Sequence, residues 1–122
     1  MRKRIRKLGF FLNCCEHGYI RINADDNFDE LSRKYFIESM LVGASTGIIR
    51  LTYIYGNVRI DDGAKRINAI MQFINDEFPI DEFVLRDIGI GADRPMYYSE
   101  LNNTEFFDRF CDYEFFVEEY TI

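Results

Sequence analysis

Apolar residues in the middle of the chain recur at the spacing of one helix face. Between Ala64 and Phe78, the apolar residues at positions 67, 70, 71, 74 and 78 fall at i, i+3, i+4, i+7 and i+11. Pro79 follows and cannot continue a helix. The pattern therefore predicts an amphipathic helix over residues 64–78. A second helix is predicted over residues 29–41, because acidic residues open this segment and Gly43 stands just beyond its end.

Other segments show the alternation, or the β-branched and aromatic content, that is typical of strands. The predicted strands are residues 18–23, the two arms of a hairpin within residues 47–61, residues 82–91 with a glycine-rich loop at their end, and residues 113–122. A short capped helix is predicted within residues 102–113. The resulting order, β-α-β-β-α-β-α-β, predicts a small α/β or α+β domain with three or four helices around one mixed sheet.

Length and composition set the scale of this fold. With 122 residues, of which 48% are hydrophobic and 16% aromatic, we expect one domain around one core. No apolar run approaches 18 residues, so no membrane-spanning segment is expected. The basic start followed by apolar residues is similar to a secretory signal, but its apolar part ends at Asn13, which is too short. We therefore expect a cytoplasmic protein.

Charge is distributed unevenly along the chain. Five of the fifteen basic residues lie in the first seven positions, and ten basic and twenty-one acidic residues follow, a formal charge of −11. Such acidity repels nucleic-acid phosphate, so general nucleic-acid binding is not expected. Residues 1–17 are interpreted as a basic arm and lead-in to a single domain over residues 18–122. The arm is either a solubilising, partly frayed tail or a contact for a phosphate or an acidic partner.

The three cysteines match no usual ligand pattern. Cys14 and Cys15 are adjacent and Cys111 is distant, which suits neither a disulfide framework nor a zinc spacing, even with His17 nearby. We expect reduced, mostly packed thiols and no metal.

The start of the predicted 64–78 helix carries the most distinctive chemistry. Asp62 or Gly63 would cap the helix, and a glycine lets a ligand approach the backbone. Free N–H groups and the helix dipole favour an anion there, although they disfavour the basic side chains of Lys65 and Arg66. A bound phosphate would account for this basic pair, with Arg66 as a forked donor and Lys65 as a point charge. An ordinary solvated turn is the other interpretation.

Two segments together resemble a known family. "FDELSRKYFIESMLVG" (residues 28–43) and "VRIDDGAKRINAIMQFINDEFPI" (residues 58–80) are similar to the N-terminal domain of GmrSD-type restriction proteins, a branch of the ParB/sulfiredoxin-like fold. Asp62, Gly63 and Arg66 match the Asp, Gly and Arg of the family's Asp-Gly-Gln-Gln-Arg signature. The likeness extends over residues 18–122.

The resemblance implies a nucleotide-binding domain that controls a partner nuclease. By resemblance, the phosphates of a nucleoside triphosphate, with Mg²⁺, would lie against Asp62, Gly63, Lys65 and Arg66, and Arg21 is the nearest further guanidinium. The family's Gln-Arg pair and both glutamines of the signature are absent, which argues against hydrolysis without excluding it.

Catalysis would make further demands on the fold. An NTPase would need a base and a charge-stabilising residue, which the fold would have to gather from Asp61, Asp62, His17, Arg21 and Arg94. With one histidine in the whole chain and no metal-nuclease cluster, the protein is not a nuclease by itself.

Two functions from different classes follow. The first is a stand-alone nucleotide- or phosphate-binding regulatory domain that acts through a partner protein in phage–host conflict. The second is a catalytically dead, phage-encoded acidic protein that binds and inhibits or modulates a host or defence protein. The candidate partner-binding residues are Phe106, Phe107, Phe110 and Phe116, because exposed aromatics are favoured at interfaces, although core packing explains most aromatics in this region.

Overall fold

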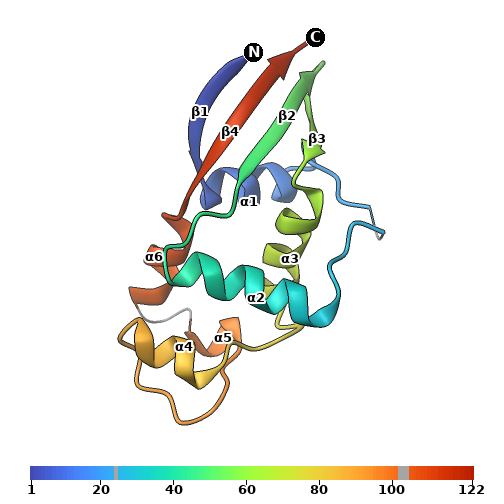
Figure 1. The fold of residues 1–122 in the computed structure, drawn as a ribbon. Coiled ribbons are helices and arrows are strands. Elements are labelled where there is room, and N and C mark those ends of the chain that lie inside the picture. Colours follow the sequence, from blue (N-terminus) through green and yellow to red (C-terminus); the bar gives the residue numbers. More distant parts are fainter. Residues whose placement is uncertain (24, 102–104) are drawn as a thin grey trace.

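The computed structural model describes residues 1–23, 25–101 and 105–122 as one sheet and a group of helices (Figure 1). The strands are β1 (Arg2–Lys7), β2 (Ile48–Ile54), β3 (Asn57–Asp62) and β4 (Glu114–Thr121). They lie in the order β1-β4-β2-β3, with β2 and β4 parallel and the other neighbouring pairs antiparallel. The predicted small α+β domain with a mixed sheet is therefore confirmed.

The helices gather at one end of the sheet and behind its lower half (Figure 1). They are α1 (Leu8–Glu16), α2 (Glu30–Leu41), α3 (Ala64–Ile74), α4 (Glu82–Asp87), α5 (Tyr98–Leu101) and α6 (Glu105–Cys111). The other end of the sheet projects beyond them, and both chain termini lie there side by side. No helix among the described residues is long and apolar enough to cross a membrane.

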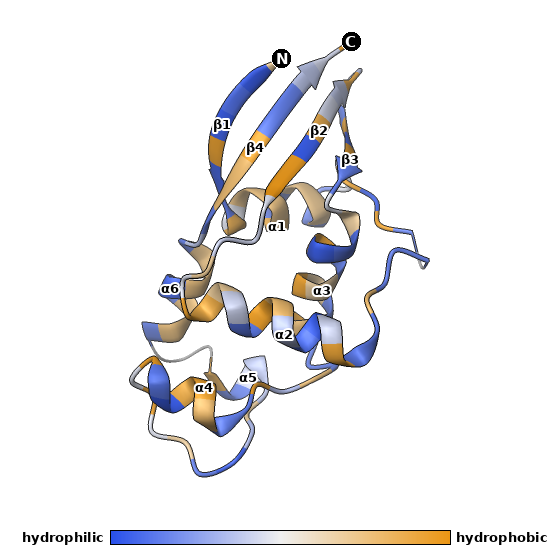
Figure 2. Ribbon diagram, in the orientation of Figure 1, coloured by the Kyte–Doolittle hydropathy of each residue, from blue (hydrophilic) through white to orange (hydrophobic). Residues whose placement is uncertain are grey.

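The first strand corrects the expectation of a partly frayed basic arm. The segment Arg2–Lys7 pairs with β4 along its whole length. Three of its basic residues lie opposite acidic ones: Arg2 opposite Glu119, Lys3 opposite Glu118 and Lys7 opposite Glu114. Figure 2 shows β1 as mostly hydrophilic, so its pairing depends on these opposite charges as well as on backbone hydrogen bonds.

Two predicted helices and the hairpin are confirmed. In α2 the side chain of Asp29 accepts a hydrogen bond from the Ser32 N–H at 2.8 Å and caps the helix. The helix α3 begins at Ala64 as predicted, but it ends before residue 78, because Asp76 adopts a left-handed conformation with φ of 60°. The hairpin of β2 and β3 lies within the predicted residues 47–61, apart from Asp62 at its end, and turns at Tyr55 and Gly56, and β4 is the predicted final strand.

Two predicted strands are wrong. Residues 18–23 form turns and irregular backbone after α1, where the N–H of Tyr19 bonds back to the carbonyl of Cys14. Residues 82–87 form α4, because Glu82 in the first turn and Arg86 in the last turn complement the helix dipole and favour a helix over the local β-type content. The predicted helix within residues 102–113 is α6, and its expected cap residues 102–104 lie outside the described residues.

Phe73 on α3 is the centre of the aromatic core. Its ring centroid lies 5.6 Å from those of Phe78 and Tyr98, 6.3 Å from that of Phe106 and 5.5 Å from that of Phe110. Phe106 and Phe110 are buried and stack on each other. These two residues therefore belong to the core, which corrects their assignment as partner-binding candidates.

We predict that Phe73→Ala lowers the free energy of unfolding by roughly 3–5 kcal/mol, because it leaves a cavity among four aromatic rings. Urea denaturation at constant temperature measures the loss. Phe83→Ala is the matched control, because that ring is 68% exposed on α4 and its removal should change stability by about 0.5 kcal/mol or less. Equal losses for the two variants would contradict this description of the core.

Candidate functional site

Arg66, expected to hold a phosphate, is bound to the chain's own backbone. Its Nη1 donates to the carbonyl oxygen of Thr46 at 2.7 Å, and its Nη2 donates to that of Ile48 at 2.9 Å. The side chain is only 14% exposed, and Oδ1 of Asp62 lies 3.6 Å from Nη2. The guanidinium therefore fastens the start of β2 to the start of α3, which leaves few of its donors for a ligand.

The rest of the signature segment stays together at the start of α3. Asp62 ends β3 and pairs with Arg50 at 3.0 Å. Gly63 has φ of 117°, and a Cβ there would come within 3.1 Å of the Ile49 side chain, so packing and backbone conformation both require glycine. Lys65 is exposed in the first turn. Of the predicted phosphate ligands, Lys65 is exposed, and its charge also acts on Asp29, the cap residue of α2.

Arg21 lies apart from this segment. It lines a shallow depression together with Asn57, the first residue of β3, whereas Asp62 is the last. Arg59, the residue of the depression nearest to Asp62 along β3, is three residues away from it, about 10 Å at roughly 3.3 Å per residue. The structure does not bring Arg21 to the signature segment.

The residues proposed for NTP hydrolysis are also dispersed. Asp61 accepts a hydrogen bond from Thr52, and Arg94 pairs with Glu100 in the segment around α5. His17 has its Nδ1 2.9 Å from a backbone carbonyl oxygen of α1, a capping position. Among the described residues, no group of three or more His, Cys, Asp or Glu side chains is placed to hold a metal ion, and the three cysteines are free.

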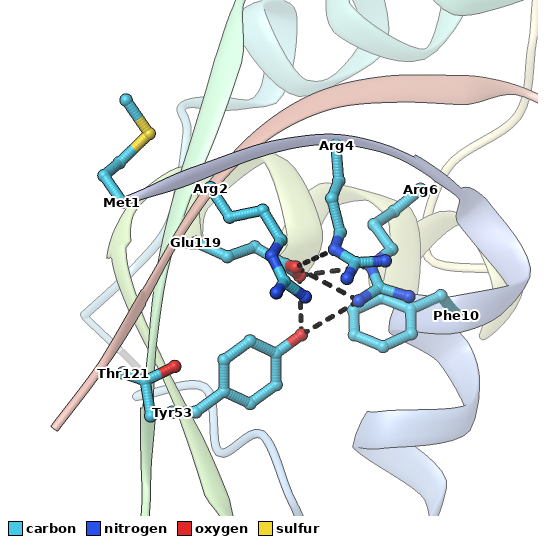
Figure 3. Close-up of a pocket in the computed structure, with 8 residues that line it drawn as sticks. All are labelled: Met1, Arg2, Arg4, Arg6, Phe10, Tyr53, Glu119 and Thr121. Carbon is cyan, nitrogen blue, oxygen red and sulfur yellow. Dashed lines mark hydrogen bonds and ion pairs between the residues drawn. The ribbon is translucent and has the colours of Figure 1, made fainter.

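A different site lies on the face of the sheet that α1 partly covers, at its projecting end (Figure 3). It is an open cavity of about 750 Å³, which we call the arginine cavity. It is lined by Met1, Arg2, Arg4, Arg6, Phe10, Tyr53, Glu119 and Thr121. The three arginines occupy alternate positions of β1, so their side chains all leave the same face of the sheet.

Glu119 on β4 is the hub of this cavity. Although it is a carboxylate, it is only 6% exposed. Arg6 donates to it through Nε and Nη2, both at 3.1 Å, and the Nε of Arg4 lies 3.2 Å from Oε1. The hydroxyl of Tyr53 on β2 donates to Oε2 at 2.5 Å. These contacts join β1, β4 and β2 through one side chain.

The contacts of Glu119 and Tyr53 determine the direction in which the pKa of each side chain is shifted. Burial would raise the pKa of Glu119, but hydrogen bonds from Arg6 and Tyr53 and the charges of Arg6 and Arg4 hold it below its ordinary value. Burial, with the hydrogen bond to Glu119, raises the pKa of Tyr53 to about 12. Near neutral pH, Glu119 is therefore charged and Tyr53 is a neutral donor.

Positive charge is in excess in the cavity. Arg4 and Arg6 share one carboxylate, and the side chain of Arg2 forms no hydrogen bond or ion pair within the part of the chain that the structure describes. The three guanidinium groups and the one carboxylate leave two uncompensated positive charges, in an otherwise acidic protein. The site can attract and bind an anion, but its only carboxylate is held by arginines and is a poor general base.

Sequence reasoning assigned none of these residues to a site, although it allowed the basic arm a phosphate contact. The sequence features that indicate this cavity are the arginines at alternate positions 2, 4 and 6 and the acidic residues of the final strand. Such charge complementarity predicts a strand pair with one basic face.

Comparison with known proteins does not give this chain a family. No protein-family model, no curated protein sequence and no solved structure matches it. The resemblance to the N-terminal domain of GmrSD-type restriction proteins, and the ParB/sulfiredoxin-like fold that it implies, therefore stay predictions.

We predict that Arg66→Ala lowers the free energy of unfolding by about 2 kcal/mol, because the carbonyls of Thr46 and Ile48 lose a charged donor. Chemical denaturation measures the effect. Lys65→Ala, one residue away and exposed, is the control and should be nearly neutral. If Arg66→Ala were as stable as the control, the fastening role would be refuted.

We predict that Glu119→Gln lowers stability near neutral pH by about 2 kcal/mol, less than for a fully buried pair because the arginines are partly exposed. Since the folded pKa of Glu119 lies below the unfolded one, its stabilisation is present above the unfolded pKa. It is lost as pH falls through the folded pKa.

Urea denaturation of both proteins between about pH 7 and about pH 3 measures this dependence. The stability difference between wild type and variant should shrink as the pH falls. A difference that stays constant over this range would contradict the ionised state of Glu119.

Proposed function

We propose that this chain is a phosphate-binding domain that holds its ligand in the arginine cavity. The observation that supports the proposal is the guanidinium of Arg2, which has no partner among the described residues and lies beside two arginines that share a single carboxylate. An excess of two positive charges suits a phosphate dianion, and arginine forks match its oxygens in two-point contacts.

Size and shape of the cavity favour a phosphate carried by a small organic molecule. A volume of about 750 Å³ falls within the range of small-molecule sites, roughly 300–1,000 Å³. The rings of Tyr53 and Phe10 supply apolar wall (Figure 3). A nucleotide, with or without Mg²⁺, combines a phosphate group with a flat ring and is the ligand class that we favour.

The proposed role is binding, not hydrolysis. Glu119 is held by Arg4, Arg6 and Tyr53, so no free carboxylate in the cavity would activate water. A ligand held by Arg2 would tie β1 more firmly to the sheet, which gives binding a structural consequence that a partner protein could read. The partner and the role in phage–host conflict stay predictions.

The start of α3 is the competing position for a phosphate. It keeps Lys65 and free N–H groups, but Arg66 is fastened to backbone carbonyls. The two positions predict different residue dependence, so single substitutions distinguish them.

We predict that Arg2→Ala weakens binding of ATP, GTP or pyrophosphate about tenfold, the loss of one charge-assisted contact. Isothermal titration calorimetry, with melting temperature as a second readout, measures binding to wild type and variant. A ligand at a hundred times its dissociation constant should add about 2.7 kcal/mol of stability, a rise of several degrees. Binding should also weaken as salt is added.

Lys65→Ala is the control and should bind as wild type does. If Lys65→Ala abolished binding while Arg2→Ala did not, the ligand would lie at the start of α3. If no phosphate compound bound to wild type at millimolar concentration, the proposed function would be wrong.

A further inference from the structure

The face of the sheet opposite the arginine cavity is uncovered by the described helices (Figure 1). A row of apolar residues crosses three strands on this face: Ile5 on β1 lies opposite Phe116 on β4, and Phe116 lies beside Ile48 on β2. All three are exposed, Phe116 by 60% although its strand is in the middle of the sheet. A contiguous apolar row on an inner strand is typical of a surface that packs against another protein.

The adjacent row on the same face is charged and alternates in sign. It runs across all four strands as Lys3, Glu118, Arg50 and Asp62. Arg50 donates to Glu118 at 2.8 Å and pairs with Asp62 at 3.0 Å. In the strand order β1, β4, β2, β3, the charges of this row are positive, negative, positive and negative. When the order of the strands is reversed, the charge at each position therefore has the opposite sign.

We propose that this face binds a second copy of the chain, around a twofold axis that runs parallel to the strands between β4 and β2. Rotation about this axis reverses the order of the strands in the facing sheet. Each row of one subunit then faces the same row of the partner subunit. Lys3 then faces Asp62 of the partner subunit, and Glu118 faces Arg50 of the partner subunit. Every facing pair has opposite sign, which is the self-complementarity that a twofold interface requires.

The alternative face-to-face arrangement is disfavoured by the same charges. An axis perpendicular to the strands would place each strand over its own counterpart, so Lys3 would meet Lys3 of the partner subunit. Both arrangements keep the strands of the facing sheets aligned, as sheet packing favours, so only the charges distinguish them. The charges of this row therefore favour the axis parallel to the strands.

The apolar row supplies the contact area. Under the proposed axis, Phe116 of one subunit packs on Ile48 of the partner subunit. At the foot of the face, a hollow of about 300 Å³ lined by loop residues 43–47, Tyr113 and Phe116 offers room for a side chain of the partner. The patch is about 19 by 20 Å, four strands by six residues, which is small for a permanent dimer. We therefore expect a reversible, concentration-dependent dimer.

This inference does not depend on the arginine cavity, which lies on the other face. Sedimentation velocity from micromolar to millimolar protein tests it, with a rise from the monomer to the dimer coefficient expected. Phe116→Glu should abolish the rise, whereas Phe83→Glu, equally exposed but on α4, should leave it unchanged. A wild type that stays monomeric throughout, or a dimer that tolerates Phe116→Glu, would overturn the proposal.

A charge exchange tests the orientation. Lys3→Glu and Asp62→Lys should each weaken self-association at least tenfold, because two like-charged contacts replace two attractive ones. An equal mixture of the two variants should dimerise again, since position 3 of each then meets the opposite charge at position 62 of the other. No recovery in the mixture of folded variants would overturn the proposed axis.

Folding of each variant is checked by circular dichroism and melting temperature. If Asp62→Lys does not fold, Lys3→Glu is compared with Lys3→Gln. The proposed axis requires the charge reversal to weaken the dimer more than neutralisation does, and equal effects would overturn it.

Discussion

The burial of one carboxylate, Glu119, is the constraint on which the rest of this structure depends. A buried charge is stable only when it is paired and hydrogen-bonded. Here the partners come from β1 and β2: Arg4 and Arg6 on one side and the Tyr53 hydroxyl on the other. The strand β1 has a single apolar residue, so this ion pair and the facing charges of β4 hold a highly polar segment in the sheet.

The placement of β1 shapes both faces of the sheet. Because neighbouring side chains on a strand point in opposite directions, the arginines at even positions line one cavity and Lys3 and Ile5 lie on the other face. On one side this gives an excess of positive charge around a hollow. On the other side it completes an apolar row and a row of alternating charge. One strand therefore supplies both surfaces to which we attribute binding.

Sequence patterns predicted those parts of the fold that depend on local signals. The periodic apolar face of α3, the acidic start of α2 and the hairpin of β2 and β3 each follow from a local residue pattern, and the structure contains all three. What was missed depends on distant residues. β1 has no apolar alternation and forms because an acidic strand more than a hundred residues later pairs with it. Residues 82–87 have β-type composition, yet the charges of Glu82 and Arg86 at the two ends and the burial of Leu85 favour a helix.

The candidate site also combines features that a local sequence pattern predicts with features that depend on distant residues. The segment Asp62–Arg66 could be picked out in the sequence because its residues are consecutive. The role of Arg66 could not be predicted, because its guanidinium donates to carbonyl oxygens of another segment. The arginine cavity joins residues from the start, the middle and the end of the chain, so no local motif marks it. Its sequence signal is a match of charge between two termini, which becomes informative only once the two strands are paired.

The most direct test of the phosphate-binding proposal is an NMR titration that follows the arginine side-chain Nε–Hε resonances as pyrophosphate or a nucleotide is added. The arginine cavity predicts saturable shifts for Arg2, with smaller shifts for Arg4 and Arg6, and an unchanged Arg66. Shifts confined to Arg66 and the backbone N–H groups of the first turn of α3 would contradict the proposed location. No saturable shift at any arginine would contradict phosphate binding itself.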